Sequence, residues 1–296
     1  MAPRGSADPE PARGPGEPPA GAMASAQLIG RLRAAGCVFA EEEAQILVRA
    51  ARDRAQLEAW CTRRVAGEPL EHVVGEVAFA GRTFLVGPGT FVPRRRSEYL
   101  VERVLRAAAA PTGASLTLVE MCCGVGAIGL SAAQELHRRG VRVDLHLADV
   151  DPVALYWAER NAHRAGLPAV RLHRGDLWSA LPPELRGAVD VVMANAPYVP
   201  TSEIVLLPPE ARLHEPVAAL DGGPDGTDLH HRLADDAPRW LRPGGVLVIE
   251  TSDGQAAVTA ELMEAAGLRA RIDRAPARWG TAVTGRQAGP GSGRPG

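Results

Sequence analysis

The sequence predicts an α/β protein whose main domain is a Rossmann-like, mostly parallel sheet of seven strands. Three observations predict this fold. Strand-like and helix-like segments alternate regularly from Leu116 onward, a glycine-bearing turn follows the first strand, and polar side chains stand at the ends of successive strands. Alternating strand and helix units favour parallel strands joined by right-handed crossovers. Because ligands of such sheets bind at the carboxyl ends of the strands, we expect the site there.

Composition limits the class of protein. The chain has 296 residues, 46% of them hydrophobic, and a formal net charge of -2. This length allows one large or two ordinary domains. The sequence lacks an apolar run of about 18 residues, so no membrane-spanning helix or membrane partner is expected. Residues 1–22 lack the apolar centre of a signal peptide. The charge gives no sign of a nucleic-acid-binding protein, and no stable nucleic-acid partner is expected.

The cysteines indicate a cytoplasmic setting. Cys37, Cys61, Cys122 and Cys123 match neither a zinc spacing nor a disulfide framework. We therefore expect a reduced protein without a metal site, and we expect a monomer.

The N-terminal third is predicted to hold three segments. Residues 1–24 are rich in Pro, Gly and Ala and are expected to be disordered. Apolar residues recur three and four apart through residues 25–67, which predicts a small helical domain. Residues 68–93 are expected to form a linking β-hairpin, with turns at Ala80-Gly81 and Gly87-Pro88-Gly89. The residues expected in its short strands are Val73, Val77, Phe79, Phe84, Val86 and Phe91.

The main domain is expected to span residues 94–287, followed by a disordered tail at 288–296. Its first helix is expected to start after Ser97 as the N-cap and to end near Ala109. The later strands are expected at Leu116–Met121, Val141–Ala148, Val170–His173, Val189–Met193, Val246–Glu250, 268–274 and 278–285. The later helices are expected at Gly126–Arg139, Pro152–Ala165, Asp228–Trp240 and Ala256–Ala266.

The tetrapeptide Asn195-Ala196-Pro197-Tyr198 follows a buried strand and is the first candidate site. Asn195 offers one acceptor and two donors on a short side chain. Pro197 stiffens the turn, and Tyr198 adds an aromatic wall with a polar tip. This combination suits a planar NH2 group, whose hydrogens the Asn195 side-chain oxygen and the Ala196 carbonyl would accept. A single Asn-x-Pro turn is more often only structural, so the interpretation depends on the rest of the chain.

The loop Glu120–Gly126, which joins the first strand to its helix, is the second candidate site. Its glycines let the backbone approach a ligand. Asp149 ends the next strand, where an acid suits ribose hydroxyls, and Asp176 ends the third. Glu120 would repel a pyrophosphate but attract an ammonium group. The pattern therefore favours S-adenosylmethionine over NAD, and the adjacent cysteines are expected to pack and not to act as nucleophiles.

These motifs resemble those of the HemK/PrmC-type protein-(glutamine-N5) methyltransferases, over about residues 63–287. The matching stretches are Gly67-Glu68-Pro69-Leu70 with Val73-Val74-Gly75, Val92-Pro93-Arg94 through Glu98, Glu120 through Gly126, Asn195 through Tyr198, and Glu215-Pro216 with Ala219 through Gly226. The resemblance implies a class I S-adenosylmethionine-dependent methyltransferase fold behind a helical, substrate-recognising domain. It implies N5-methylation of a protein glutamine, in the Gly-Gly-Gln of a peptide-chain release factor or in a ribosomal protein, with S-adenosylhomocysteine as the second product.

The resemblance also implies roles for individual residues. It implies cofactor binding by Cys122, Cys123, Gly124, Val125, Gly126, Asp149, Asp176 and Leu177. Glu120 and Asn195 are also expected to contact the cofactor. Catalysis and substrate binding fall to Asn195, Ala196, Pro197 and Tyr198, and substrate binding also to Arg94. The chain departs from the family pattern in four places: Ala196 replaces the first Pro of Asn-Pro-Pro-Tyr, Cys122 replaces a Gly, and Arg95 and Arg96 replace Pro and Glu.

Three other functions stay open at this point. A nucleic-acid base N-methyltransferase would bind the same planar NH2 group, and the run Arg94-Arg95-Arg96 would suit a nucleic acid, although the net charge speaks against it. A small-molecule N-methyltransferase of a biosynthetic pathway would use the same site. A binding protein could keep the fold without catalysis.

Overall fold

The computed structural model describes residues 20–167, 170–275, 277 and 280–289. The chain divides into two compact units, residues 1–67 and 68–296. Within the described residues, no helix is long and apolar enough to cross a membrane.

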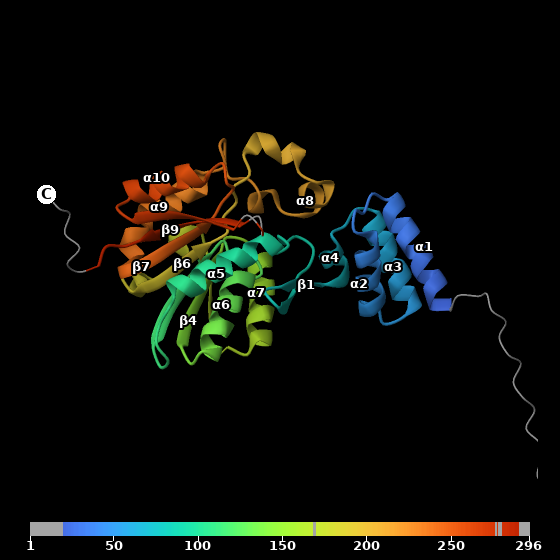
Figure 1. The fold of residues 1–296 in the computed structure, drawn as a ribbon, viewed down its shortest axis with the longest axis horizontal. Helices are drawn as coiled ribbons and strands as arrows, with labels where there is room; N and C mark the ends of the chain where they lie inside the picture. Colours follow the sequence, from blue (N-terminus) through green and yellow to red (C-terminus); the bar gives the residue numbers. More distant parts are fainter. Residues whose placement is uncertain (1–19, 168–169, 276, 278–279, 290–296) are drawn as a thin grey trace, which may run out of the picture. The chain divides into compact units, whose positions relative to one another are not determined.

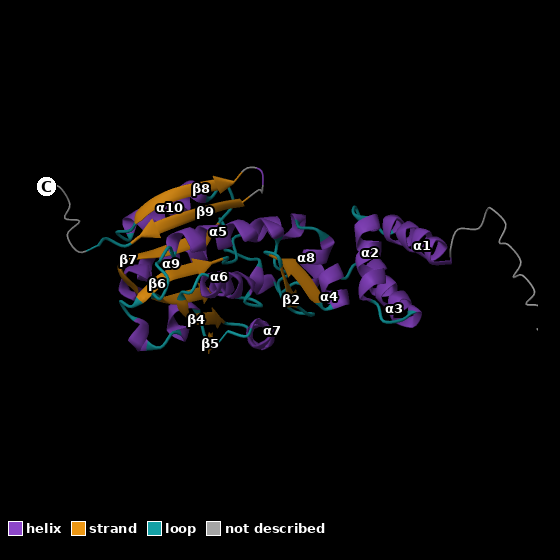
Figure 2. Cartoon of the chain, turned by 60° about the horizontal axis from the view of Figure 1, so that its bottom comes forward, coloured by secondary structure: helices purple, strands orange, loops and turns teal. Residues whose placement is uncertain are grey.

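The first unit is built from the helices α1 (Ala20–Ala34), α2 (Ala40–Ala50) and α3 (Arg54–Val65), which Figure 2 draws in purple. Their core consists of the buried residues Leu28, Leu32, Cys37, Ala40, Ala44, Leu47 and Cys61. Asp53 caps α3 by accepting a hydrogen bond of 2.8 Å from the Gln56 backbone N–H. The disorder expected for residues 1–24 is wrong for 20–24, because this alanine-rich stretch starts α1. Residues 1–19 lie outside the described part.

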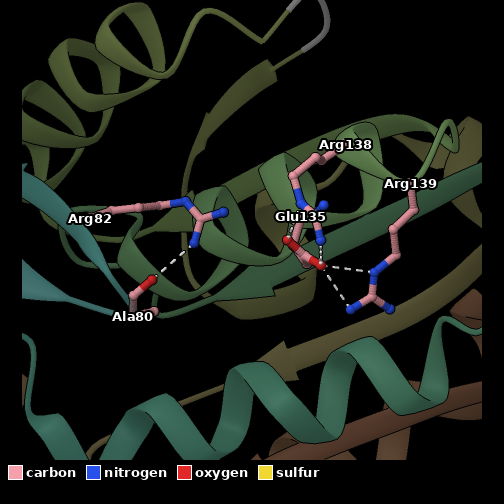
Figure 3. Close-up of polar contacts among 5 residues, drawn as sticks. All are labelled: Ala80, Arg82, Glu135, Arg138 and Arg139. Carbon is pink, nitrogen blue, oxygen red and sulfur yellow. Dashed lines mark hydrogen bonds and ion pairs between the residues drawn. The ribbon is translucent and has the colours of Figure 1, made fainter.

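The second unit begins with α4 (Leu70–Val74) and a hairpin of two antiparallel strands, β1 (Glu76–Phe79) and β2 (Arg82–Leu85). Ala80 turns the chain with a φ of 50°, and the Arg82 guanidinium donates to its carbonyl at 2.9 Å (Figure 3). Val73 lies in α4 and Phe91 follows the hairpin, so the strands expected at these two residues are wrong.

The hairpin is part of the second unit's core. Val77, Phe79, Phe84 and Val86 are buried in the same apolar cluster as one face of the main sheet. Asn161 ties the hairpin to this unit with its side-chain amide, which accepts from Leu85 N–H at 2.7 Å and donates to the Leu85 carbonyl at 2.9 Å. The same NH2 donates to the Val125 carbonyl at 3.0 Å.

The main sheet has seven strands in the order β5-β4-β3-β6-β7-β9-β8, of which β9 alone runs antiparallel to its neighbours. The strands are β3 (Ser115–Met121), β4 (Arg142–Asp149), β5 (Val170–Arg174), β6 (Val189–Ala194), β7 (Leu241–Glu250), β8 (Arg269–Ala275) and β9 (Gly280–Arg286). The mostly parallel sheet of seven strands that the sequence predicts is confirmed. The expected start of the last strand, at 278–279, lies outside the described residues.

Helices cover both faces of the sheet (Figure 1). One face carries α5 (Glu98–Ala107), α6 (Ala127–Arg138) and α7 (Pro152–Ala165), and the other carries α9 (Asp228–Trp240) and α10 (Ala256–Ala265). Leu118 and Met193 belong to the apolar cluster of the first face, and Val119 and Val192 to that of the second. This alternation follows from the opposite directions of successive side chains on a strand. Shorter helices are η1 (Arg95–Ser97), η2 (Leu177–Ala180), η3 (Pro183–Leu185), η4 (Thr201–Leu206), α8 (Pro209–His214) and η5 (Val217–Ala219).

The strand order reverses direction between β3 and β6, which are neighbours in the middle of the sheet. Such a reversal opens a crevice at the carboxyl ends of the two strands. Met121 pairs with Ala194, and Ala194 pairs with Ile249 of β7. The residues that come next, Cys122, Asn195 and Glu250, are therefore brought to one level of the sheet.

Candidate active site

The loop after β3 turns sharply beside the open end of the sheet. Cys122, Gly124 and Gly126 adopt φ values of 51°, 53° and 77°, in the left-handed region. A Cβ added at Gly126 would lie 3.0 Å from Leu147 Cδ1, so the helix start packs closely on β4. A Cβ added at Gly124 would meet no atom within 4 Å, so the loop is open on that side. The loop is thus open to a ligand at half-buried Gly124, whereas Cys123, Val125 and Gly126 are buried.

Asp149 stands at the end of β4 and shapes this loop. One of its carboxylate oxygens accepts from the Gly124 N–H at 2.8 Å, and the other from the Asp151 N–H at 2.9 Å. Burial raises the pKa of Asp149, and the two hydrogen bonds oppose this shift. A carboxylate has about four lone-pair positions. Asp149 therefore keeps acceptor capacity for ribose hydroxyls on the open side of the loop.

Glu120 lies beneath the loop. Its exposed fraction is 1%, and its carboxylate accepts from the Gly129 N–H at 2.8 Å. Burial raises the pKa of Glu120 to about 8. Gly129 leaves room for the carboxylate, because a Cβ there would lie 2.6 Å from it. In this geometry Glu120 holds the first turn of α6, and the ammonium contact expected from the sequence finds no support.

The other expected cofactor residues lie around the same loop. Cys123 is buried, and Cys122 is half-buried with its pKa raised, mainly by burial. A raised thiol pKa fits a packing role and not a nucleophile. Asp176, before η2, is exposed and pairs with Arg232 at 2.7 Å. Leu177 is buried with a φ of 47°. No local sequence pattern predicted the contact between Asp176 and Arg232.

The Asn195–Tyr198 turn leaves β6 next to this loop. Asn195 and Tyr198 are half-buried, whereas Ala196 and Pro197 are buried. Asn195 Nδ2 donates to Ser97 Oγ at 3.3 Å. The accessible part of the turn is therefore Asn195 and Tyr198. The role of the Ala196 carbonyl as an acceptor stays a prediction, because the exposed fraction of Ala196 is 1%.

Three residues not expected in the site surround this turn. Glu250 ends β7 with 4% of its surface exposed, and it accepts from the Ser97 hydroxyl at 3.0 Å. Arg96 Nε lies 3.6 Å from the same Glu250 oxygen, and its guanidinium lies 5.9 Å from the centre of the Tyr198 ring. The sequence signal that could have identified Glu250 is its position as an acid at the end of β7, the strand beside β6. Ser97 precedes α5 as predicted, but its side chain makes no cap, because the hydroxyl is bonded to Glu250.

Arg94, the expected substrate contact, is engaged within the chain. It donates to both carboxylate oxygens of Glu215, at 2.7 and 2.6 Å, and its guanidinium lies 4.8 Å from the centre of the Phe91 ring. Burial raises the pKa of Glu215, and Arg94 opposes the shift. Glu215 also accepts from the Val92 N–H at 3.2 Å. This geometry assigns Arg94 to holding the segment before α5, and its substrate role stays a prediction.

A loop at 221–226 packs against the Asn195–Tyr198 turn. Gln255 Nε2 donates to the carbonyls of both Tyr198 and Asp225, each at 2.9 Å. A β-bridge joins Val199 to Asp221. The turn is thereby fixed from two sides, by Ser97 and by this loop.

His230, on α9, lies behind Tyr198 at a ring-centre distance of 6.4 Å. Its Nδ1 is 2.9 Å from Thr259 Oγ1, and the residue has no exposed surface. Burial lowers its pKa from 6.5 to about 4, and Asp225 opposes the shift. Between about pH 4 and pH 6.5, His230 is therefore protonated in the unfolded chain and neutral in the folded chain. The free energy of unfolding should therefore fall as the pH drops from about 6.5 to 4, by about 3 kcal/mol from His230.

Urea unfolding of the parent protein and of His230→Gln, at pH 7.5 and pH 5, checks this expectation. Buried Glu120 shifts stability in the opposite direction, so the difference between the two proteins isolates His230. An equal loss of stability in both proteins would contradict the assignment.

Comparisons with known proteins identify the family of this chain. A family model described as the methyltransferase small domain matches residues 96–207. The release factor glutamine methyltransferase of Streptomyces coelicolor is 42% identical over 193 residues, which are 65% of this chain and 66% of that protein. The chain thus spans just under two thirds of the length of this relative. The release factor glutamine methyltransferase of Moorella thermoacetica is 40% identical over 207 residues, 69% of each protein.

Among solved structures, a methyltransferase from Pyrococcus furiosus is similar with a TM-score of 0.50 at 18% identity, covering 69% of this chain and 88% of that chain. This similarity concerns the fold alone. The second unit has the class I methyltransferase fold, as predicted. The chain belongs to the release factor glutamine methyltransferase family.

Proposed function

We propose that this protein transfers a methyl group from S-adenosylmethionine to the side-chain nitrogen of a protein glutamine, and that a peptide-chain release factor carries this glutamine. Relatives that are about two fifths identical are named for this activity. The observation that carries the proposal is the Asn195 amide, held by Ser97 at the end of β6. It stands at the strand-order reversal, beside the loop Cys122–Gly126.

The residues around the loop fit this cofactor. Gly124 leaves the backbone open to a ligand, and Asp149 at the end of β4 retains acceptor positions for a ribose diol. Gly126 is the N-cap of α6, and Val125 precedes it in the loop. When bound, S-adenosylmethionine supplies a methyl group made electrophilic by its sulfonium.

The residues of the turn position the methyl acceptor. A glutamine amide nitrogen is a poor nucleophile, because its lone pair is delocalised into the carbonyl. Asn195 Oδ1 accepts one of its N–H groups and orients the nitrogen toward the loop. Tyr198 packs on the amide plane, and Pro197 keeps the turn stiff. These are contributions of positioning and electrostatics, and the proton leaves after transfer, so no strong base is required.

Methylation of a nucleic-acid base has less support than it had from sequence. Arg94 pairs with Glu215, and Arg96 lies against Glu250 and Tyr198. Two of the three arginines of the basic run are thus engaged with carboxylates. A glutamine of a ribosomal protein uses the same amide chemistry and is the other protein substrate to test.

A methyl-transfer assay with labelled cofactor tests the proposal. Release factors, ribosomal proteins and RNA are offered in parallel, and the product is mapped by mass spectrometry. We expect label on a release-factor glutamine. Label on ribosomal protein alone would change the substrate, and label on RNA alone would overturn the glutamine proposal.

Asp149→Ala should weaken S-adenosylmethionine binding, because it removes hydrogen bonds to a charged group. The expected loss is about 1.5–3 kcal/mol, measured by calorimetry. Asp235→Ala is a matched control, since this acid is exposed on α9 and pairs with His231. Equal affinity in both variants would remove Asp149 from the site.

A further inference from the structure

We propose that Ser97 and Glu250 are positioning residues that set which end of the Asn195 side-chain amide faces the methyl acceptor. The inference deepens the proposed function and relies on it for its activity readout. It also has a structural readout that needs no substrate.

The orientation of the Asn195 amide decides whether the site can bind its substrate. The two ends of an asparagine amide have similar size but opposite hydrogen-bonding character, oxygen accepting and NH2 donating. A glutamine substrate presents NH2. Asn195 therefore has to present its oxygen, because an outward NH2 would set donor against donor.

A directed chain of hydrogen bonds fixes this orientation. An ionised carboxylate only accepts, so the Ser97 hydroxyl hydrogen points to Glu250, at 3.0 Å. The Ser97 oxygen then has its lone pairs free and accepts from Asn195 Nδ2 at 3.3 Å. Asn195 Oδ1 is thereby turned away from Ser97. Each bond in the chain has only one possible polarity while Glu250 is ionised.

Arg96 keeps this polarity. Its Nε lies 3.6 Å from the Glu250 oxygen that Ser97 contacts, and the positive charge favours the ionised carboxyl. Burial, the largest influence, raises the pKa of Glu250, and the Ser97 bond, Arg96 and Tyr198 oppose this rise. A protonated Glu250 could donate to Ser97, which would then donate to Asn195 and reverse the amide.

The burial of Ser97 and Glu250 indicates that their hydrogen bonds have a function besides stabilising the fold. Ser97 is 2% exposed and Glu250 is 4% exposed. Burying a carboxylate is unfavourable unless it is bonded, and an apolar side chain would close the end of β7 at less cost. The register of β6 and β7 places this carboxylate beside Asn195.

The first variant is Ser97→Ala, which removes the hydroxyl that links Glu250 to Asn195 by hydrogen bonds. We expect the single-turnover rate of methyl transfer to a release factor to fall about tenfold, while cofactor affinity stays within about twofold. Ser97→Thr keeps the hydroxyl and should restore most of the rate. Ser131→Ala is the matched control, because Ser131 is equally buried and its hydroxyl makes no hydrogen bond within the described residues.

The structural readout follows the Asn195 NH2 group by 15N–1H NMR, with its signals identified by their loss in Asn195→Asp. We expect Ser97→Ala to shift these signals and to speed their exchange with water. Glu250→Gln keeps the size of the side chain and removes its charge. It should give two sets of Asn195 NH2 signals, one for each orientation of the amide, and it replaces Ser97→Ala as the test if that variant fails to fold.

Two results overturn the inference. One is an unchanged Asn195 NH2 group in Ser97→Ala and Glu250→Gln. The other is a rate for Ser97→Ala equal to that of Ser131→Ala. If the parent protein transfers no methyl group to any release factor, the proposed function fails, and the NMR result still decides whether Ser97 and Glu250 orient Asn195.

Discussion

Asn195→Ala should slow methyl transfer about a hundred- to a thousand-fold, the range for losing one preorganised polar contact in a site. Cofactor affinity should change far less, because Asp149 and the loop Cys122–Gly126 stay intact. The measurement is single-turnover transfer beside calorimetry of cofactor binding. Transfer at the full rate would show that the turn is only structural, and the glutamine-amide proposal would fail with it.

The chain contains one other asparagine, which serves as a matched control. Asn161 holds the hairpin and the Val125 carbonyl through its side-chain amide. Asn161→Ala should therefore lower stability and cofactor affinity and leave the turn in place. The opposite patterns of the two variants separate a contact to the methyl acceptor from a contact within the fold.

Asn195→Asp is a harsher change than the sequence suggests. It keeps an acceptor oxygen, and from sequence alone some activity is expected. In the structure, however, Ser97 already donates its hydrogen to Glu250. A second carboxylate beside Ser97 would have no donor there and would be repelled by Glu250. We expect this variant to bind cofactor and to lose most of its activity.

Gly226→Ala should destabilise the protein by about 3 kcal/mol and displace Tyr198. Gly226 has a φ of 78°, and a Cβ there would lie 2.3 Å from the Tyr198 carbonyl oxygen and from Gln255 Nε2. Left-handed strain of about 1–2 kcal/mol and overpacking of about 1–3 kcal/mol add. The displaced groups are those that join the loop to the turn, so methyl transfer should fall as well.

Thermal or urea unfolding measures this loss against Gly187→Ala. Gly187 has a φ of 70°, but a Cβ there would meet nothing within 4 Å. Gly187→Ala therefore introduces the same left-handed backbone strain but no close contact of the new Cβ with a neighbouring atom. Equal destabilisation of the two variants would mean that the approach of Gly226 to Tyr198 is unimportant.

The regular elements were predictable because their signals are local. Apolar periodicity located every strand of the main sheet, and Pro152 and the glycine turns located the helix ends. One exception is Leu70–Val74, whose valines favour a strand. There Pro69 starts a helix, and Gly75, with a φ of 88°, ends it after five residues.

The site was predictable in part. Motif residues that meet at the carboxyl ends of β3, β4 and β6 were found, because strand ends can be located from sequence. The series of hydrogen bonds from Asn195 through Ser97 to Glu250 could not be predicted, because these residues lie on three separate segments. Ser97 matched a local capping pattern, and a tertiary bond to Glu250 replaced the cap. The ion pair of Arg94 with Glu215 was missed for the same reason, since Glu215 is far along the chain.

The two edges of the main sheet bear on how copies of this protein meet at high concentration. β5 and β8 are the outermost strands, and their unpaired backbone groups could each accept a strand from another molecule. Both edges carry exposed arginines, Arg171 and Arg174 on β5 and Arg269 and Arg271 on β8. Arg171 pairs with Asp144 and Arg271 with Asp273, so the like charges that would meet when two such edges come together are chiefly those of Arg174 and Arg269. The sheet is thereby guarded against edge-to-edge aggregation, although its interior strands are apolar along most of their length.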